Sequence, residues 1–209
     1  IYPHREEYFG VAGTGIGQKV AVLNLVVYRD YLDTPVLVHV KARLPWLLVL
    51  MCSYVFTGGM IASFEASLSA VIALVAYMPM LMGTGGNSGT QSSTVIITGM
   101  ATGALELSDI LKVLWKEFRI GIIVGICVSV LNYFRIVLFD HNGSLVALTV
   151  CFSMVLIVVI AKCIGALLPM IAKKIGIDPA LIAGPMMASL TDMVALGTYF
   201  TMARIVLKI

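Results

Sequence analysis

The sequence predicts an all-α, polytopic membrane protein with five transmembrane helices. Hydrophobic residues make up 60% of the 209 residues, and the mean hydropathy is +1.01. Only 12% of the residues are charged, whereas soluble domains carry about 25%. The net charge of +3 is small and dispersed along the chain, so nucleic acid is not an expected partner. Membrane lipids are the expected surroundings.

Residues 1–43 are predicted to form an N-terminal cytoplasmic segment that ends in a short helix leading into the membrane. The apolar run Val20–Tyr28 is too short to cross a bilayer, because a spanning helix needs roughly 20 residues. Thr34 and Pro35 predict the cap and the first turn of the short helix. Since the chain begins with Ile and not Met, we expect an upstream portion to be missing.

Residues 44–209 are predicted to form the transmembrane pore domain. The fifth span opens with an Asp-Pro pair, which is typical of a helix start. Apolar stretches separated by turns place the five spans at about Leu44–Phe64, Leu68–Ala101, Asp109–Phe139, Leu145–Ala172 and Asp178–Lys208.

The second span is predicted to be a broken helix. It is longer than a membrane requires, and it is interrupted by Pro79 and by the run Gly83–Ser93, which is rich in glycine, amides and hydroxyls. Polar or irregular backbone is tolerated at membrane depth only where protein buries it or where it lines a watery cavity. Because no polar loop separates the halves, we predict one interrupted helix beside an ion or substrate path.

The charges of the loops predict the orientation of the chain. One side carries Glu65, Asp140 and His141, with few cations. The positive-inside rule therefore predicts a multi-pass protein of the cell membrane with its N-terminus in the cytoplasm and its C-terminus outside. The cations of the predicted cytoplasmic side are Lys41, Arg43, Lys112, Lys116, Arg119, Lys173 and Lys174.

Asp192 is the leading candidate for a functional side chain, because it lies inside the last apolar span. It falls about fourteen residues beyond Asp178, which at 1.5 Å per residue is about 20 Å into the helix. A carboxylate at that depth either lines a pore or is neutralised by a buried basic partner such as Lys162. Ala188 and Ala195 share its face approximately, and such small residues leave space for a hydrated ion.

Polar residues on the second span recur at three- and four-residue intervals and predict one oxygen-rich stripe. Its amide and hydroxyl oxygens suit a hard cation such as Mg²⁺, which dehydrates reluctantly. The hydroxyls of two of its threonines can alternatively bond back to their own helix. The stripe consists of Asn87, Thr90 or Gln91, Thr94 and Thr98.

The charge of the predicted site favours a homodimer. A divalent cation is balanced by about two negative charges, yet the chain supplies a single deep carboxylate, Asp192. A two-fold dimer presents that carboxylate twice on one axis, and two-fold homodimers are the commonest assembly. We therefore predict a pore at the dimer interface.

Five short segments carry a family resemblance: Pro79–Ser93 with its Gly-Gly-Asn-Ser-Gly core, Leu114–Phe118, Asp178–Ala180, Pro185 and Thr191–Asp192. Together they resemble the transmembrane domain of the MgtE family of magnesium channels, over roughly residues 44–209. The resemblance implies five helices per chain, a homodimer, and a pore lined by the second and fifth helices.

The resemblance also implies which residues meet the ion. The family's acidic residue for hydrated Mg²⁺ falls on Asp192, and a main-chain carbonyl one turn earlier falls on Ala188. Its pore positions on the second helix fall on Gly86, Thr90 and Thr94. With Asn87 from the polar stripe, these residues make up the predicted metal site.

Two departures from the family pattern concern the neck of the implied pore. Thr90 and Gly184 stand where some members have Asn. Family members usually carry a cytoplasmic N-terminal domain and a pair of CBS domains that sense Mg²⁺, and nothing in this sequence resembles them. We expect that these regulatory domains are missing from this fragment or that its gating differs.

The predicted function is a Mg²⁺-selective channel that conducts hydrated divalent cations, and not an enzyme. An enzyme would need a nucleophile with a base, and the apolar spans contain no deep His and no Ser with a plausible base. The alternative is a Na⁺- or H⁺-coupled divalent cation exchanger. That function would need a second deep ionisable site, for which Lys162 and Glu117 are the candidates.

Overall fold

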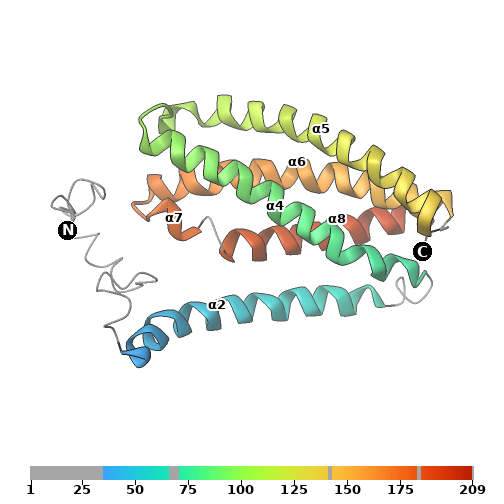
Figure 1. Cartoon of the computed structure of the whole chain (residues 1–209), viewed down its shortest axis with the longest axis horizontal. Coiled ribbons are helices and arrows are strands. Elements are labelled where there is room, and N and C mark those ends of the chain that lie inside the picture. The colour runs from blue at the N-terminus through green and yellow to red at the C-terminus, as the bar shows by residue number, and fades with distance from the viewer. Residues whose placement is uncertain (1–34, 66–70, 141–142, 183–184, 209) are drawn as a thin grey trace.

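The computed structural model describes residues 35–65, 71–140, 143–182 and 185–208. All regular structure in these ranges is helical, which confirms the all-α prediction (Figure 1). The elements are α2 (Val36–Ser63), α4 (Ala73–Ala101), the 3₁₀ turn η2 (Leu107–Asp109), α5 (Ile110–Arg135), the π-helical turn η3 (Ile136–Asp140), α6 (Ser144–Lys174), α7 (Pro179–Ile182) and α8 (Pro185–Leu207).

Five of the helices in the described ranges are long, and four of these are long and apolar enough to cross a membrane. The four candidate spans are Val36–Ser63, Leu107–Asp140, Ser144–Lys174 and Met186–Leu207. The remaining long helix, α4, has 29 residues and contains no charged side chain. It differs from its neighbours through its run of Gly, Thr, Ser, Asn and Gln, and not in length.

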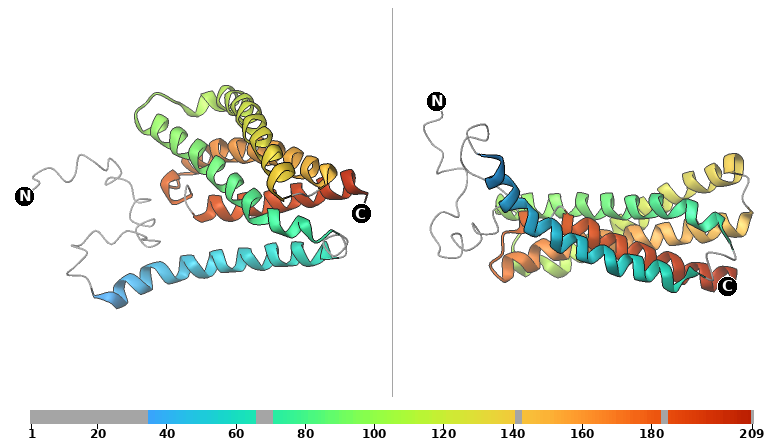
Figure 2. Two further views of the ribbon diagram at one scale, coloured as in Figure 1. Left: turned by 45° about the vertical axis from the view of Figure 1, so that its right-hand side comes forward. Right: turned by 90° about the horizontal axis from the view of Figure 1, so that it is seen from below.

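Helix α6 is the centre of the bundle. It packs against α4, α5 and α8, and α4 also packs against α8 (Figure 1, Figure 2). Half of the most apolar stretch of α6 is buried, compared with 6% for α2, which lies at the edge of the bundle against α8. The core includes Leu74 of α4, Met154 of α6 and Tyr199 of α8, and the Tyr199 hydroxyl donates to the Leu74 carbonyl at 3.0 Å.

The turn between α6 and α7 is built from local backbone chemistry. Gly176 has a φ of 77°, which side-chain-bearing residues rarely adopt. Its N–H donates to the Lys173 carbonyl at 3.2 Å, and the Ile177 N–H donates to the Ala172 carbonyl at 2.9 Å. These bonds satisfy the last carbonyls of α6. The Asp178 carboxylate then accepts the backbone N–H of Ala180 at 2.9 Å, so Asp178 caps the short helix α7. The fifth span was predicted to begin at this cap, but the helix that is long enough to span, α8, begins at Pro185.

The N-terminal boundary of the first span is corrected. The predicted short helix and the first span form one helix, α2, which runs without interruption through residues 43 and 44 and contains Pro45. Pro35 is its N-cap residue, one position later than predicted, and Thr34 lies outside the described residues. The predictions for residues 1–34 also fall outside the described ranges.

The predicted break in the second span is wrong. Helix α4 is continuous from Ala73 to Ala101, through Pro79 and through every residue of the Gly-rich run. The glycines allow close packing: a Cβ atom at Gly165 of α6 would collide with the carbonyl group of Gly89. The missing side chains allow α4 and α6 to approach closely, as small residues do in many membrane helix pairs.

Candidate functional site

The polar stripe of α4 lies on one face of the helix, as predicted. Its side chains at Asn87, Thr90, Gln91, Thr94 and Thr98 are all exposed, so no described helix of the same chain covers them. The buried face of the same turns carries small residues, namely Gly85, Ser88, Gly89, Ser92 and Ser93. Helix α4 is therefore packed on its glycine and serine face and open on its amide and threonine face.

The open face offers hydrogen-bond acceptors. The hydroxyl of Thr94 donates back to the Thr90 carbonyl at 2.9 Å, which confirms the alternative of a bond within the helix for this side chain. That bond uses the only hydroxyl proton and leaves the lone pairs of the oxygen available. The waters around a hydrated cation point their hydrogens outward, so a hydroxyl in this state can receive them.

Thr191 brings the turn of Asp192 next to the glycines of α4. Thr191 is 1% exposed. Its hydroxyl oxygen lies 3.7 Å from where a Cβ of Gly86 would be, and its methyl carbon lies 3.1 Å from the corresponding position on Gly89. The close approach of α8 to α4 therefore places Gly86 beside the residue that directly precedes the carboxylate.

Asp192 itself is half-buried. Within the described residues it has no hydrogen-bonding side-chain partner, and no Lys or Arg lies within ion-pair distance of it. The alternative of an Asp192–Lys162 pair is wrong, because the Lys162 ammonium donates instead to the hydroxyl of Ser92 at 3.4 Å. Asp192 is left as a half-buried carboxylate whose charge is not compensated within the described part of the chain.

The two alanines expected near Asp192 differ in their surroundings. Ala188 is half-buried, and its carbonyl accepts the Thr191 hydroxyl at 2.9 Å. Ala195 is fully buried, and its methyl group lies 3.7 Å from a Cβ position on Gly85. The expectation that Ala195 leaves space beside the carboxylate is therefore wrong, because it packs against α4.

The acidic residues in the described part of the chain do not gather into a metal cluster. Across the described ranges, no group of three or more His, Cys, Asp and Glu side chains could together hold a metal ion. A site built on Asp192 consequently has one carboxylate and neutral oxygens in each chain. Such a set suits an ion that keeps its waters better than an ion stripped of them.

A second polar group lies inside the bundle, behind the open face of α4. Ser92 of α4 donates to the Glu117 carboxylate of α5 at 2.5 Å and accepts from Lys162 of α6. The sequence identified Glu117 and Lys162 as separate deep charges and missed their connection. The signal was present in Ser92, because a serine on the face opposite the threonine stripe points into the bundle.

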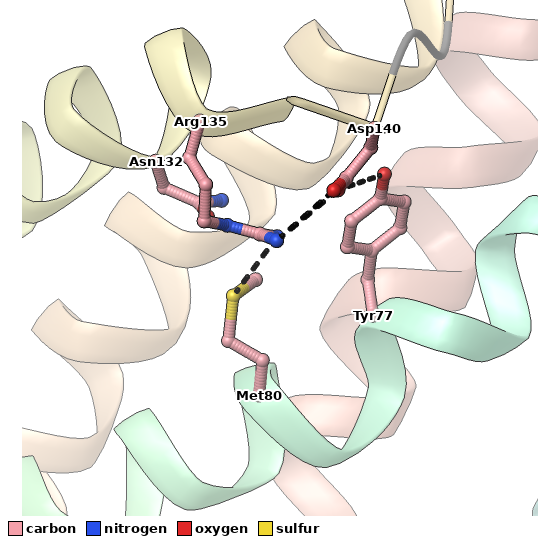
Figure 3. Close-up of polar contacts among 5 residues, drawn as sticks. All are labelled: Tyr77, Met80, Asn132, Arg135 and Asp140. Atoms are coloured by element: carbon pink, nitrogen blue, oxygen red, sulfur yellow. Dashed lines mark hydrogen bonds and ion pairs between the residues drawn. The ribbon is translucent and has the colours of Figure 1, made fainter. Parts of the chain in front are cut away.

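Further polar contacts tie α4 to the end of α5 (Figure 3). The Tyr77 hydroxyl donates to Asp140 at 2.9 Å, and Arg135 pairs with the same carboxylate at 3.1 Å. The Arg135 guanidinium also donates to the Asn132 side chain at 3.0 Å and lies 3.8 Å from the sulfur of Met80. Asp140, which the sequence placed on the loop side beyond the third span, thus joins the end of α5 to α4 through Arg135 and Tyr77.

Comparison with known proteins then places the chain in a family. The family model described as "MgtE: Divalent cation transporter" matches residues 78–202, from the first turns of α4 almost to the end of α8. The chain belongs to the MgtE divalent cation transporter family.

Curated relatives agree with the family match. The chain is 40% identical to the magnesium transporter MgtE of Thermus thermophilus over 167 residues, which are 80% of this chain and 37% of that protein. It is 35% identical to magnesium transporter MgtE of Bacillus subtilis over 171 residues, or 82% of this chain and 38% of that protein. It is 28% identical to magnesium transporter MgtE of Enterococcus faecalis over 166 residues, or 79% of this chain and 36% of that protein.

The MgtE match bears on the site in two ways. It is a family of divalent cation transporters, which confirms that the chain is not an enzyme. The matched residues include the whole open face of α4 and the turn of Asp192, whereas α2 lies outside them. The chain spans less than two fifths of the length of these relatives.

Proposed function

We propose that this chain is the membrane pore domain of a Mg²⁺ channel, through which hydrated cations pass along the open face of α4 and the Asp192 turn of α8. The observation that carries the proposal is the contact of Thr191 with Gly86 and Gly89. It sets the half-buried Asp192, which has no counter-charge among the described residues, near a helix whose polar face is not covered by the described helices of its own chain. The magnesium transporters among its relatives support Mg²⁺ as the ion.

The chemistry of the face suits an ion that keeps its inner water shell. The proposed contacts are the Asp192 carboxylate, the Ala188 carbonyl, the backbone at Gly86, and the oxygens of Asn87, Thr90 and Thr94. All are hydrogen-bond acceptors, and coordinated waters are donors. A small, fully hydrated Mg²⁺ can therefore be recognised through its waters.

Two copies of the chain complete the proposed site. One carboxylate balances half of the charge of a divalent ion, and a two-fold axis beside α4 and α8 supplies the second. The exposed stripe of α4 agrees with such an axis, because polar side chains are unfavourable against lipid. The pore then lies between two chains and not within one.

We further propose that the protein lies in the cell membrane with its N-terminus in the cytoplasm. The end of α4 and the end of α6 lie at the same end of the bundle, since the Lys173 ammonium donates to the Met100 carbonyl at 3.4 Å. This end carries Lys112, Lys173 and Lys174, so the positive-inside rule assigns it to the cytoplasm. Cytoplasmic regulatory domains upstream of the pore domain form part of the proposal.

Coupled exchange receives less support than passive conduction. An exchanger would need a second deep ionisable group that is free to bind the counter-ion. Glu117 and Lys162 carry opposite charges and are joined through Ser92, so neither offers an unpaired site. We therefore propose flux that depends on the Mg²⁺ gradient and the membrane potential, and not on Na⁺ or H⁺ gradients.

The test is Mg²⁺ flux into liposomes that contain the purified chain, measured with and without Na⁺ and proton gradients. In Asp192→Asn the shape is kept and the charge is lost. A charge and a divalent ion about 5 Å apart interact by about 6–7 kcal/mol at an effective dielectric of 20, before desolvation is subtracted. If about 1–3 kcal/mol survives, the site weakens roughly tenfold to a hundredfold.

The matched control is Glu106→Gln, which removes an exposed carboxylate outside the bundle. We expect it to keep wild-type flux, while Asp192→Asn loses Mg²⁺ flux and still assembles. Normal Mg²⁺ affinity and flux in a folded Asp192→Asn protein would show that the carboxylate is structural. Flux that collapses without a Na⁺ or proton gradient would favour the exchanger.

A further inference from the structure

Glu117, Ser92 and Lys162 form a buried charged network that joins three helices. Glu117 is 8% exposed, Lys162 is 5% exposed and Ser92 is 2% exposed. Ionisable side chains are rare inside membrane helices because their burial is costly, and those that occur pair with one another or serve a function. Glu117 comes from α5, Ser92 from α4 and Lys162 from α6.

The hydrogen bonds of this network run in one direction. The Lys162 ammonium donates to the Ser92 oxygen at 3.4 Å, and the Ser92 hydroxyl donates its only proton to the Glu117 carboxylate at 2.5 Å. Ser92 thus acts as acceptor for the cation and donor to the anion. Its orientation is determined by both charges, and hydrogen bonds to charged groups are stronger than those between neutral groups.

The network lies at the level of the proposed ion path. Ser92 is two residues from Thr90 and two from Thr94, on the opposite face of the same helical turns. A rotation of α4 about its axis would move Ser92 away from its partners and would turn both threonines by the same angle. The glycines of α4 let its backbone lie directly against α6 here, so the polar bonds of Ser92 join the helices where they are closest.

We propose that Glu117, Ser92 and Lys162 are positioning residues for ion transport: they hold α4 in the rotation that presents Thr90 and Thr94 to the ion. The proposal rests on the proposed function in one respect, that α4 lines the path. The three side chains do not touch the ion. They act through α4, and their charges compensate each other within the chain.

The main test compares two adjacent serines of α4. Ser92→Ala removes the bridging hydroxyl, whereas Ser93→Ala removes the hydroxyl of a fully buried serine that has no hydrogen-bond partner among the described residues. Both variants are purified as the full chain, with a spin label on Thr94→Cys in a background whose other cysteines are replaced by alanine. The readouts are the accessibility of the label to a water-soluble paramagnetic reagent, and Mg²⁺ flux in liposomes from the unlabelled variants.

We expect Ser92→Ala to fold, to change the accessibility of the label, and to raise the apparent KM for Mg²⁺ by about three- to twenty-fold, in line with measured interhelical hydrogen bonds in membranes. Ser93→Ala should match the parent protein in both measurements. A purely structural role would lower the yield of folded protein. It would leave the accessibility of the label and the KM for Mg²⁺ of the folded fraction unchanged. That result would overturn the proposal.

A charge-balance series provides a second and independent test. Glu117→Gln leaves the Lys162 cation buried without a counter-charge, whereas Glu117→Gln combined with Lys162→Met removes both charges. We expect the single variant to lose more folded protein than the double variant. Equal losses would contradict the charge compensation that the network requires.

The label experiment does not depend on flux. If the accessibility of the label is the same in Ser92→Ala as in the parent protein, the positioning role is overturned even if the wild-type chain conducts Mg²⁺. Conversely, a wild-type chain without Mg²⁺ flux refutes the proposed function, while a changed label still demonstrates that the network sets the rotation of α4.

Discussion

Substitution of Gly165 by alanine is predicted to separate α4 from α6 and to destabilise the bundle. A Cβ atom at this position would collide with the carbonyl group of Gly89, and its distances to the carbonyl carbon and the Cα atom of Gly89 would be 2.9 and 3.0 Å. These are backbone atoms of a continuous helix, so they cannot rotate out of the way as the end of a side chain can. One or both helices must shift.

The expected cost follows from overpacking. Inserting a methyl group into a well-packed interior typically costs about 1–3 kcal/mol. Gly83→Ala is the matched control, because a Cβ at Gly83 of α4 meets no atom within 4 Å. In that variant only the helix preference of alanine remains, which is worth about 0.5–1 kcal/mol in favour of alanine. Gly165 also lies inside a helix, so it gains the same preference and this contribution cancels between the two variants. They should therefore differ by the overpacking cost, about 1–3 kcal/mol in the free energy of unfolding.

The assay is equilibrium unfolding of the purified chain in mixed micelles, followed by helical circular dichroism as the denaturing detergent fraction increases. Gly165→Ala should unfold at a lower fraction than the wild type, and Gly83→Ala at the same or a higher fraction. Gly89→Ala provides a check from the other helix, since its Cβ would lie 3.2 Å from the Ala161 carbonyl oxygen. If Gly165→Ala and Gly83→Ala unfold at the same detergent fraction, the close approach of α4 and α6 at Gly165 does not stabilise this fold.

Two further predictions concern assembly and orientation. Thr94→Cys, on the open face of α4, should form cross-links between chains, whereas Ala195→Cys should not, because Ala195 is fully buried within its own chain; full flux from a demonstrably monomeric preparation would contradict the dimer. In a background without the native cysteines, a cysteine at Glu106 should react with an impermeant thiol reagent only from the cytoplasmic side, and one at Asp140 only from the outside. Labelling of both from the same side would disprove the orientation.

Much of the fold followed from local properties of the sequence. Lipid requires each backbone polar group to be satisfied within its own segment, so long apolar stretches can only be helices. Side chains spaced three and four residues apart share a helix face, which made the stripe from Asn87 to Thr98 predictable without coordinates. The Asp178 cap of α7 was also predictable from the sequence, because an N-cap bond involves only the next few residues of the chain.

The partners of the interior residues were decided by the tertiary structure. Whether the glycines of α4 break the helix or allow it to pack depends on Gly165, which is distant in the sequence and reaches Gly89 only through the packing of α6. Likewise, the sequence offered Asp192 as a partner for Lys162, and the packing of α6 on both α4 and α5 directed Lys162 to Ser92 and, through it, to Glu117. Composition and periodicity specify which face of a helix is polar, because that depends on near neighbours. Only the arrangement of the helices specifies which polar groups meet, because the distance between them depends on how the whole bundle packs.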